Sequence, residues 1–314
     1  MAKSPNDNEL RIVRLFDAPV ELVWKAWTDE KHVGNWWGPR GFTLTSKSKD
    51  VRPGGKWIYT MHGPDGVDYP NIATYYEVEE FAKLVYDHGA TETTPALFRV
   101  TVTFEQTKNQ TVMDMTMTVA SAEAAKQMQK FIKDAGGNGT WDRLGEYLEE
   151  QQNQRDVFII NRSFNANQAA LFELWSNPKH FSNWMGPTGS SMEILAADVR
   201  KGGSLLYSMI NAEGSQMYGK INYLTIQPSE LLIYTQNFCD QNGDLCKPPF
   251  APTWPDSMRT TVSFSAEDTD ETRITLKWEV AGPATDIERK TFKEAKPGMT
   301  TGWTGSFDKL DGLL

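Results

Sequence analysis

The sequence is short of cysteine and has no long apolar run. Its 314 residues include 2 cysteines, Cys239 and Cys246, with no histidine nearby. Such a pair provides neither a disulfide framework nor a good metal site, so we expect free thiols in a reducing cytoplasm, no bound metal and no cofactor. No apolar stretch approaches the roughly eighteen residues of a membrane span, and the polar start MAKSPNDNEL lacks the apolar part of a secretory signal. We therefore expect a cytoplasmic protein without membrane insertion.

Positive charge is also scarce, and it is scattered. Lys and Arg number 32 against 41 Asp and Glu, which gives a net charge of -9 and a pI near 5.1. Because phosphate backbones are bound by clustered Lys and Arg, the sequence argues against nucleic acid and anionic membrane surfaces as partners. Hydrophobic residues make up 39% of the chain and aromatic residues 11%, which is enough to bury real cores. The length exceeds one comfortable core and fits two domains.

The sequence repeats itself over most of its length. KHVGNWWGPRG (31–41) returns as KHFSNWMGPTG (179–189), and a shift of 148 positions aligns 12–86 with 160–234 without a gap. The register then moves because the second copy carries an insertion, CDQNGDLCKPPFAPTWPD. Both copies finish on an amphipathic segment, GTWDRLGEYL against GSFDKLDGLL. A period this long indicates two whole domains, 1–152 and 153–314, joined at the Gln-rich EEQQNQRD.

The order of elements in the first copy predicts an α+β domain. An alternating strand, LRIVRLFD, is followed by a helix with its apolar residues at i, i+3, i+4 and i+7, and by a shorter helical segment that ends at Gly38 and Pro39. A run of antiparallel strands and one long closing helix, from about Ala122 to Glu150, complete the copy. We expect the helices on one side of a curved antiparallel sheet.

The motifs resemble a known family. Phe-x-Ala, V-x-x-x-W-x-A-W-T-D, W-W-G-P and D-x-R-P-G-G-x-W-x-Y, followed by a closing amphipathic helix, are similar to the Hsp90 ATPase activator homologue-like (AHSA1-like) domains of the Bet v 1/START-like superfamily, also called SRPBCC. The second copy is less complete, since Asn167, Met185 and Lys201 replace Pro19, Trp37 and Pro53. The resemblance implies two helix-grip domains, each a curved antiparallel sheet wrapped around a long C-terminal helix with two short helices. It also implies an apolar cavity between sheet and long helix.

Alternation along the strands and the implied cavity together give the candidate ligand-binding residues. They are Tyr59, Met61, Met115, Met117 and Trp141 in the first copy and Tyr207, Met209, Leu276, Trp278 and Phe307 in the second. Met and aromatic side chains suit an adaptable apolar pocket in which the Tyr hydroxyls orient a polar end of the ligand. A Met-rich inner face is equally typical of ordinary core filling, so both interpretations stay open.

Other repeated residues are interpreted as structural. Trp36 and Trp184, beside Gly-Pro at a helix end, suit packing. His32 and His180 lack an accompanying acid or nucleophile, and a position near the last carbonyls of a helix explains them. Asp50 with Arg52, and Asp198 with Arg200, are expected to form pairs beside a Gly-Gly turn. We predict no catalytic residues and no metal ligands.

Three functions remain open. We favour the binding of a hydrophobic or aromatic small molecule by a carrier, sensor or sequestering module. A hydrolase- or cyclase-like enzyme would need a polar cluster inside the cavity, and the inward positions are nearly all apolar. The third is a protein-interaction scaffold of the co-chaperone kind, related to Hsp90, with a protein partner. We expect a monomer whose two copies form an internal pseudo-dimer.

Overall fold

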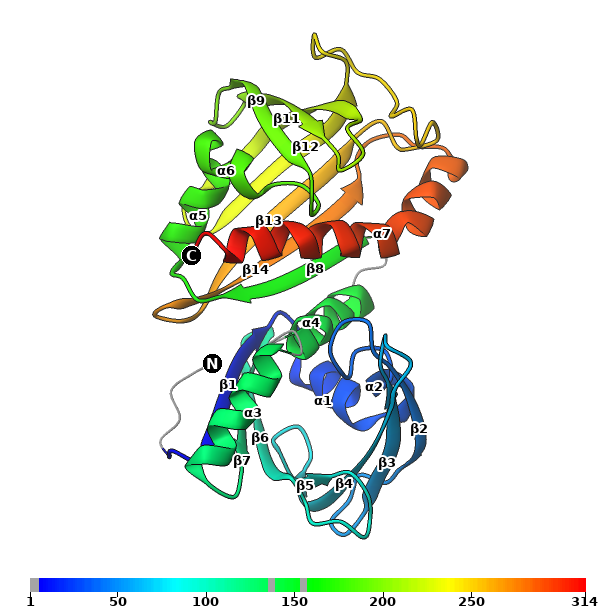
Figure 1. Cartoon of the computed structure of the whole chain (residues 1–314), viewed down its shortest axis with the longest axis vertical. Helices are drawn as coiled ribbons and strands as arrows, with labels where there is room; N and C mark the ends of the chain where they lie inside the picture. Colours follow the sequence, from blue (N-terminus) through cyan, green and yellow to red (C-terminus); the bar gives the residue numbers. More distant parts are fainter. Residues whose placement is uncertain (1–5, 135–138, 153–156) are drawn as a thin grey trace. The chain divides into compact units, whose positions relative to one another are not determined.

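The computed structural model describes residues 6–134, 139–152 and 157–314. The chain divides into two compact units, Met1–Gln152 and Asn153–Leu314, and each contains a seven-stranded antiparallel sheet with helices packed on it (Figure 1). The α+β helix-grip fold predicted for each half is confirmed. Among the helices described, none combines the length and the apolar character needed to cross a membrane.

The strands of the first unit run in the order β1-β7-β6-β5-β4-β3-β2, so the first strand lies beside the last. This neighbourhood pairs Leu10 with Met117 and Ile12 with Met115. The elements are β1 (Glu9–Phe16), α1 (Val20–Thr28), α2 (Glu30–Val33), β2 (Thr43–Lys49), β3 (Lys56–His62), β4 (Asp68–Glu79), β5 (Lys83–Gly89), β6 (Phe98–Thr107), β7 (Gln110–Thr118), α3 (Ala122–Asp134) and α4 (Gly139–Gln152).

The second unit repeats this order as β8-β14-β13-β12-β11-β10-β9. A longer connection between β12 and β13 carries the inserted segment of the sequence. The elements are β8 (Val157–Phe164), α5 (Gln168–Ser176), α6 (Pro178–Trp184), β9 (Ser191–Ala197), β10 (Ser204–Ile210), β11 (Gln216–Gln227), β12 (Leu231–Cys239), β13 (Met258–Asp268), β14 (Glu271–Val280) and α7 (Asp286–Asp311).

The repeated Trp residues join the two short helical segments of each unit. The indole of Trp36 donates to the backbone oxygen of Ala26 in α1 (3.0 Å), and that of Trp184 donates to the oxygen of Leu174 in α5 (2.9 Å). Neither Trp exposes any surface to solvent. Both are therefore core residues whose N–H group is paired, as expected from their structural interpretation.

The glycine of the repeated phrase, Gly38 or Gly186, allows a turn in which the backbone packs closely against a methionine. Gly38 and Gly186 have φ of 96° and 109°, in the region that favours glycine. A Cβ added at Gly38 would lie 3.3 Å from the sulfur of Met61, and one at Gly186 would lie 2.9 Å from Cε of Met209. The Gly-Pro turn is thus packed against a methionine of β3 or β10, and the register from phrase to methionine is the same in both units.

The closing helices differ between the units. The single helix expected from Ala122 to Glu150 is described as two, α3 and α4, and residues 135–138 between them lie outside the described part of the chain. In the second unit α7 is one helix of 26 residues, capped by Thr285, and it bends along its length (Figure 1). Pro297 inside it explains the bend.

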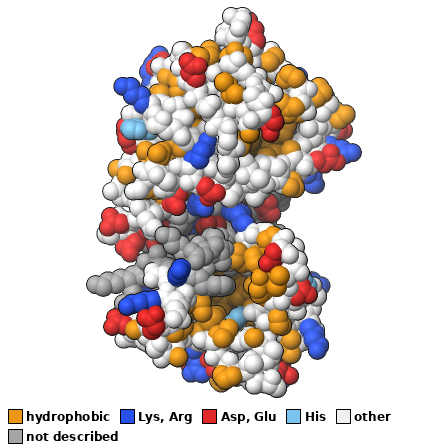
Figure 2. All heavy atoms as spheres, in the orientation of Figure 1, with side chains coloured by type: hydrophobic (Ala, Val, Ile, Leu, Met, Phe, Trp, Pro, Cys, Tyr) orange, Lys and Arg blue, Asp and Glu red, His pale blue; other side chains and the backbone are white. Residues whose placement is uncertain are grey.

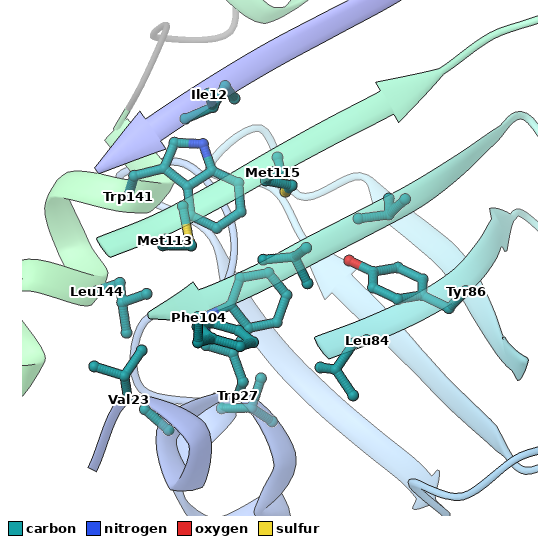
Figure 3. Close-up of a cluster of buried hydrophobic side chains, with 14 of the residues drawn as sticks. Ile12, Val23, Trp27, Leu84, Tyr86, Phe104, Met113, Met115, Trp141 and Leu144 are labelled. Carbon is teal, nitrogen blue, oxygen red and sulfur yellow. The ribbon is translucent and has the colours of Figure 1, made fainter. Parts of the chain in front are cut away.

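The core of the first unit is densely aromatic. Trp141 of α4 stacks on Trp27 of α1, with 5.7 Å between ring centroids and 12° between planes. Figure 3 shows Trp141 extending from its helix beside Met113 of β7, with Phe104 and Trp27 below them in the view. The cluster ties α1 and α4 to the middle of the sheet, and the pocket described next lies beside it.

Candidate functional site

A pocket lies between the sheet and the closing helices of the first unit. Its volume is about 190 Å³. On the face drawn in Figure 2, hydrophobic side chains gather around a hollow in this unit. The first pocket is lined by Ile12, Trp37, Gly38, Pro39, Tyr59, Met61, Asn71, Tyr86, His88, Phe98, Val100, Met115, Met117, Ile132, Thr140 and Trp141.

All five candidate residues of the first copy lie on this lining. The strand residues reach it because alternation turns every second side chain of β3 and β7 inward. Trp141 arrives from α4. The candidates are Tyr59, Met61, Met115, Met117 and Trp141.

Sequence reasoning missed the polar centre of the pocket, which is His88. Its Nε2 lies 2.9 Å from the hydroxyl of Tyr59, and the indole N–H of Trp37 donates to the same hydroxyl over 3.1 Å. A signal for His88 was present, because alternation along β5 from Leu84 through Tyr86 puts His88 on the same inward face.

Burial shifts the pKa values of this hydrogen-bonded pair away from neutrality. Loss of water around the imidazole lowers the pKa of His88 to about 4. The same loss of water raises the pKa of Tyr59 far above its usual value, and the Trp37 N–H opposes that rise only in part. Both side chains are therefore uncharged at neutral pH. The ring of His88 also stacks on Phe98, with 4.7 Å between centroids and 9° between planes.

The second unit has a pocket of about 180 Å³ with a different wall. The inserted segment supplies part of it, through the Phe250, Trp254 and Pro255 side chains. The second pocket is lined by Tyr207, Gln236, Asn237, Phe238, Phe250, Trp254, Pro255, Met258 and Trp278. The role of the insertion, which could not be read from the sequence, is thus to build one side of this pocket.

Two of the five candidates of the second copy, Tyr207 and Trp278, line the second pocket. The other three are core residues outside its lining. Met209 packs against Gly186, Leu276 has no exposed surface, and the ring of Phe307 packs on Phe164 at 5.6 Å.

The alignment of Trp141 with Phe307 is corrected by the packing of the helices. Trp303 of α7 stacks on Trp175 with 6.1 Å between centroids and 11° between planes, which reproduces the stacking of Trp141 on Trp27. Phe307 lies four residues after Trp303, about one helical turn further along the same face. Aligning GTWDRLGEYL with GSFDKLDGLL by their first glycine therefore matches α4 to a part of α7 that is one helical turn too far along the chain.

Tyr207 hydrogen-bonds to a different partner from that of Tyr59. Gln236 stands at the position of His88 under the shift of 148, and its Nε2 donates to the Tyr207 hydroxyl over 2.7 Å. Tyr207 also lies across Gly219, which faces it on β11, and a Cβ added at Gly219 would overlap the phenol ring and its hydroxyl. A residue with any side chain larger than hydrogen would push Tyr207 out of its place.

Two further polar groups of the first unit lie outside the pocket lining. The ammonium of Lys49 is 3.5 Å from the ring centroid of Trp57 and 3.3 Å from the hydroxyl of Tyr75, and burial lowers the pKa of Lys49 to about 7. His32 lies in the last turn of α2, as expected, and its Nδ1 also lies 2.6 Å from the hydroxyl of Tyr147 in α4. It therefore links two helices. The same expectation is wrong for His180, which lies in the first turn of α6.

No cluster of His, Cys, Asp and Glu suited to a metal ion occurs among the residues that the structure describes. Cys239 is buried and Cys246 exposed, and both are free thiols.

Comparison with known proteins identifies the family. The sequence model of the family described as "Activator of Hsp90 ATPase homolog 1-like protein" matches residues 17–149 and again residues 165–314. The sequence has no match among curated proteins.

Several solved structures are similar to this chain. A solution structure of a protein from Arthrobacter aurescens is 28% identical, with a TM-score of 0.44, over 49% of this chain and 94% of that one. A crystal structure of a protein from Nitrosomonas europaea is 21% identical, with a TM-score of 0.43, over 48% of this chain and 99% of that one. DynU16, from the dynemicin biosynthetic locus, is 15% identical over 98% of this chain and 99% of its own, with a TM-score of 0.35. Since the family match covers most of the sequence, in two segments, this chain belongs to the Activator of Hsp90 ATPase homolog 1-like family and carries two such domains in tandem.

Proposed function

We propose that the protein binds uncharged hydrophobic small molecules, one in each pocket, as a carrier, sensor or sequestering module. The observation that supports this most is the lining of the first pocket, which contains no Asp, Glu, Lys or Arg among the residues that the structure describes. An apolar pocket with a few polar groups that fix orientation is typical of small-molecule sites. In this proposal residues 1–152 and 153–314 are two ligand-binding domains of one chain. The five candidates of the first unit contact one ligand, and Tyr207 and Trp278 contact the other.

The volumes limit the size of the ligand. An engineered cavity of about 150 Å³ in another protein binds benzene, so pockets of about 190 and 180 Å³ fit one or two small rings. A ligand of about ten heavy atoms needs about 0.8 kcal/mol per atom for micromolar affinity, which is below the ceiling of about 1.5 kcal/mol for very small ligands. Micromolar to millimolar binding is therefore the expected range.

The polar pair in the first pocket supports binding over catalysis. General acid–base catalysis is most efficient when the pKa lies near the working pH. The pKa of His88 is lowered to about 4 and that of Tyr59 is raised, so neither group exchanges protons readily at neutral pH. An enzyme of the hydrolase or cyclase type stays the alternative, and slow turnover of a bound ligand, abolished in a Tyr59→Phe variant, would favour it.

Titration with a small neutral fluorescent dye of two fused rings, such as 1-naphthylamine, tests the proposal. Met117→Trp fills the first pocket and Met258→Trp fills the second, so each variant is the control for the other. We expect two binding sites per chain, one site in either variant, and none in the double variant. Circular dichroism and the melting temperature establish that each variant is folded.

Dye binding that is weak in the wild type and unchanged in both filled variants would contradict the proposal. In that case a scaffold for protein contacts, as the Hsp90-related family description invites, becomes the better interpretation. Its own readout is the ATPase rate of Hsp90 with and without this chain.

A further inference from the structure

The direction of the hydrogen bonds in the first pocket depends on what each group can donate and accept. An indole nitrogen only donates, so the Tyr59 hydroxyl accepts from Trp37. A hydroxyl can accept twice, so the second bond depends on the His88 tautomer. The Tyr59 O–H has no other acceptor among the described residues, and it is paired only when it donates to Nε2 of His88, 2.9 Å away. The imidazole is uncharged because burial lowers its pKa to about 4. A neutral imidazole that accepts at Nε2 carries its proton at Nδ1.

The Nδ1–H group of His88 takes no part in these hydrogen bonds. It is buried, and no hydrogen-bond partner for it exists within the described part of the chain. A buried donor without a partner costs about 1–3 kcal/mol, so a partner from outside the protein is favoured. Stacking on Phe98 keeps the ring in its plane and so keeps the donor pointing in one direction.

We infer that the first pocket selects uncharged aromatic ligands that carry a hydrogen-bond acceptor, such as the carbonyl of an aryl ketone or a quinone, and that Nδ1 of His88 donates to this acceptor. The inference rests on the proposed function. An anionic acceptor is disfavoured because the described residues of the lining offer no positive charge to pair with it. A purely hydrocarbon ligand would leave the buried donor unpaired.

The second pocket provides a contrast within the same chain. Gln236 replaces His88, and with its amide nitrogen engaged on Tyr207 its oxygen is buried without a partner among the described residues. The indole N–H of Trp278 is buried and unpaired in the same pocket. The second pocket therefore offers both an acceptor and a donor to a ligand, whereas the polar centre of the first pocket offers a donor. The exchange of His88 for Gln236 thus changes which polar groups a ligand meets.

Three ligands of nearly equal shape test the inference: acetophenone, α-methylstyrene, in which a CH₂ group replaces the carbonyl oxygen, and benzoate. Competition with the neutral dye is measured in the full chain carrying Met258→Trp. In this variant the second pocket is filled, so the dye is displaced from the first pocket alone. We expect acetophenone to bind about tenfold more tightly than α-methylstyrene, and benzoate to bind most weakly. The carbonyl stretch of bound acetophenone should shift to lower wavenumber, as hydrogen bonding to the oxygen requires.

His88→Phe keeps a ring for stacking and removes the donor, and His88→Gln installs the residue of the second unit. Both should abolish the preference for acetophenone and the shift of the carbonyl stretch while α-methylstyrene still binds. The infrared shift separates a direct hydrogen bond from a change in pocket shape. If either variant fails to fold, the other variant and the infrared spectrum of the wild type still test whether His88 donates to the carbonyl.

Equal affinity of the wild type for acetophenone and α-methylstyrene would overturn the inference and leave the proposed function intact. So would a preference that survives in both His88 variants, because the acceptor would then contact another group. If neither compound nor the dye binds, the proposed function fails, and the inference fails with it.

Discussion

The two units fold alike, yet they build their pockets from different residues. The repeated residues hold the helices on the sheet: Trp36 and Trp184 make the same backbone hydrogen bond, and Gly38 and Gly186 make the same turn. The residues around the pockets differ. His88 is exchanged for Gln236, and the insertion supplies a wall that the first unit lacks in this form. The two copies thus share a framework, the residues that hold the helices on the sheet, and differ in the residues that line the pockets.

The closing helices show the same contrast. With Trp141 matched to Trp303 by stacking, Pro297 corresponds to residue 135, the first residue between α3 and α4. At this point the first copy has Ala135, followed by Gly136 and Gly137, and the second copy has Pro297. Pro297 disfavours a straight helix, and α7 bends along its length.

Trp36→Ala and Trp184→Ala should have the largest effects, and equal ones. Each removes an unexposed indole, and large aromatic truncations in cores cost about 3–5 kcal/mol. Hydrogen exchange followed by mass spectrometry assigns the loss to one unit, which a single melting curve of a two-domain chain does not do. Trp36→Phe, which keeps a ring, should lose clearly less. Protection left intact in the mutated unit would show that the shared framework does not depend on these residues.

Gly219→Ala should separate the two units. The new Cβ overlaps Tyr207, so the second unit should lose about 1–3 kcal/mol, as expected for overpacking of a core. Asn71 occupies the equivalent position opposite Tyr59 and already has a Cβ, so Asn71→Ala is the matched control and should cost less than about 1 kcal/mol. Urea denaturation with unit-resolved hydrogen exchange measures both. Equal losses at the two positions would mean that Tyr207 moves aside without penalty.

His88 should make the first unit sensitive to acid. Its pKa is about 4 when folded and about 6.5 when unfolded, so the unfolded state binds the proton first as pH falls. Stability is therefore unaffected above pH 6.5 and is lost progressively from there down through pH 4. The loss at pH 5 should be about 1 kcal/mol, reduced because the ring is only partly buried. The difference in unfolding free energy between wild type and His88→Gln, measured at pH 7.5 and pH 5, isolates this contribution; an identical pH dependence of the two proteins would refute it.

The sequence predicted the framework well because the framework is local. Strand alternation and the spacing of Val20, Val23, Trp24 and Trp27 define which faces are buried, and these faces are buried in the structure. The closing helix of the first copy was expected to run through residues 135–138, which lie outside the described residues. The one-turn error at Phe307 arose because residues four apart share a helical face, so periodicity alone does not fix the register.

The pocket was harder to predict because it depends on contacts between distant elements. Alternation brought the inward residues of β3 and β7 to the first pocket correctly. It could not show that an insertion would move the second pocket toward Trp254, away from Met209 and Phe307. The chemistry at His88 depends on burial and on a hydrogen bond across 29 residues of sequence, and burial is a property of the folded chain.

The smallest effect is expected for a pair that the repeat preserves most visibly. Arg52 lies 2.9 Å from Asp50, and Arg200 lies 2.9 Å from Asp198, so the ion pair recurs in register. The four side chains are about half to two-thirds exposed, and exposed ion pairs contribute only about 0–1 kcal/mol because water and salt screen them. Arg52→Ala and Arg200→Ala should therefore each change the unfolding free energy by less than about 0.5 kcal/mol, with no difference between low and high salt beyond that amount. Denaturation at two salt concentrations measures this. A loss above 1 kcal/mol in both units would mean that the repeated pair belongs to the framework and would move it into the same class as Trp36 and Trp184.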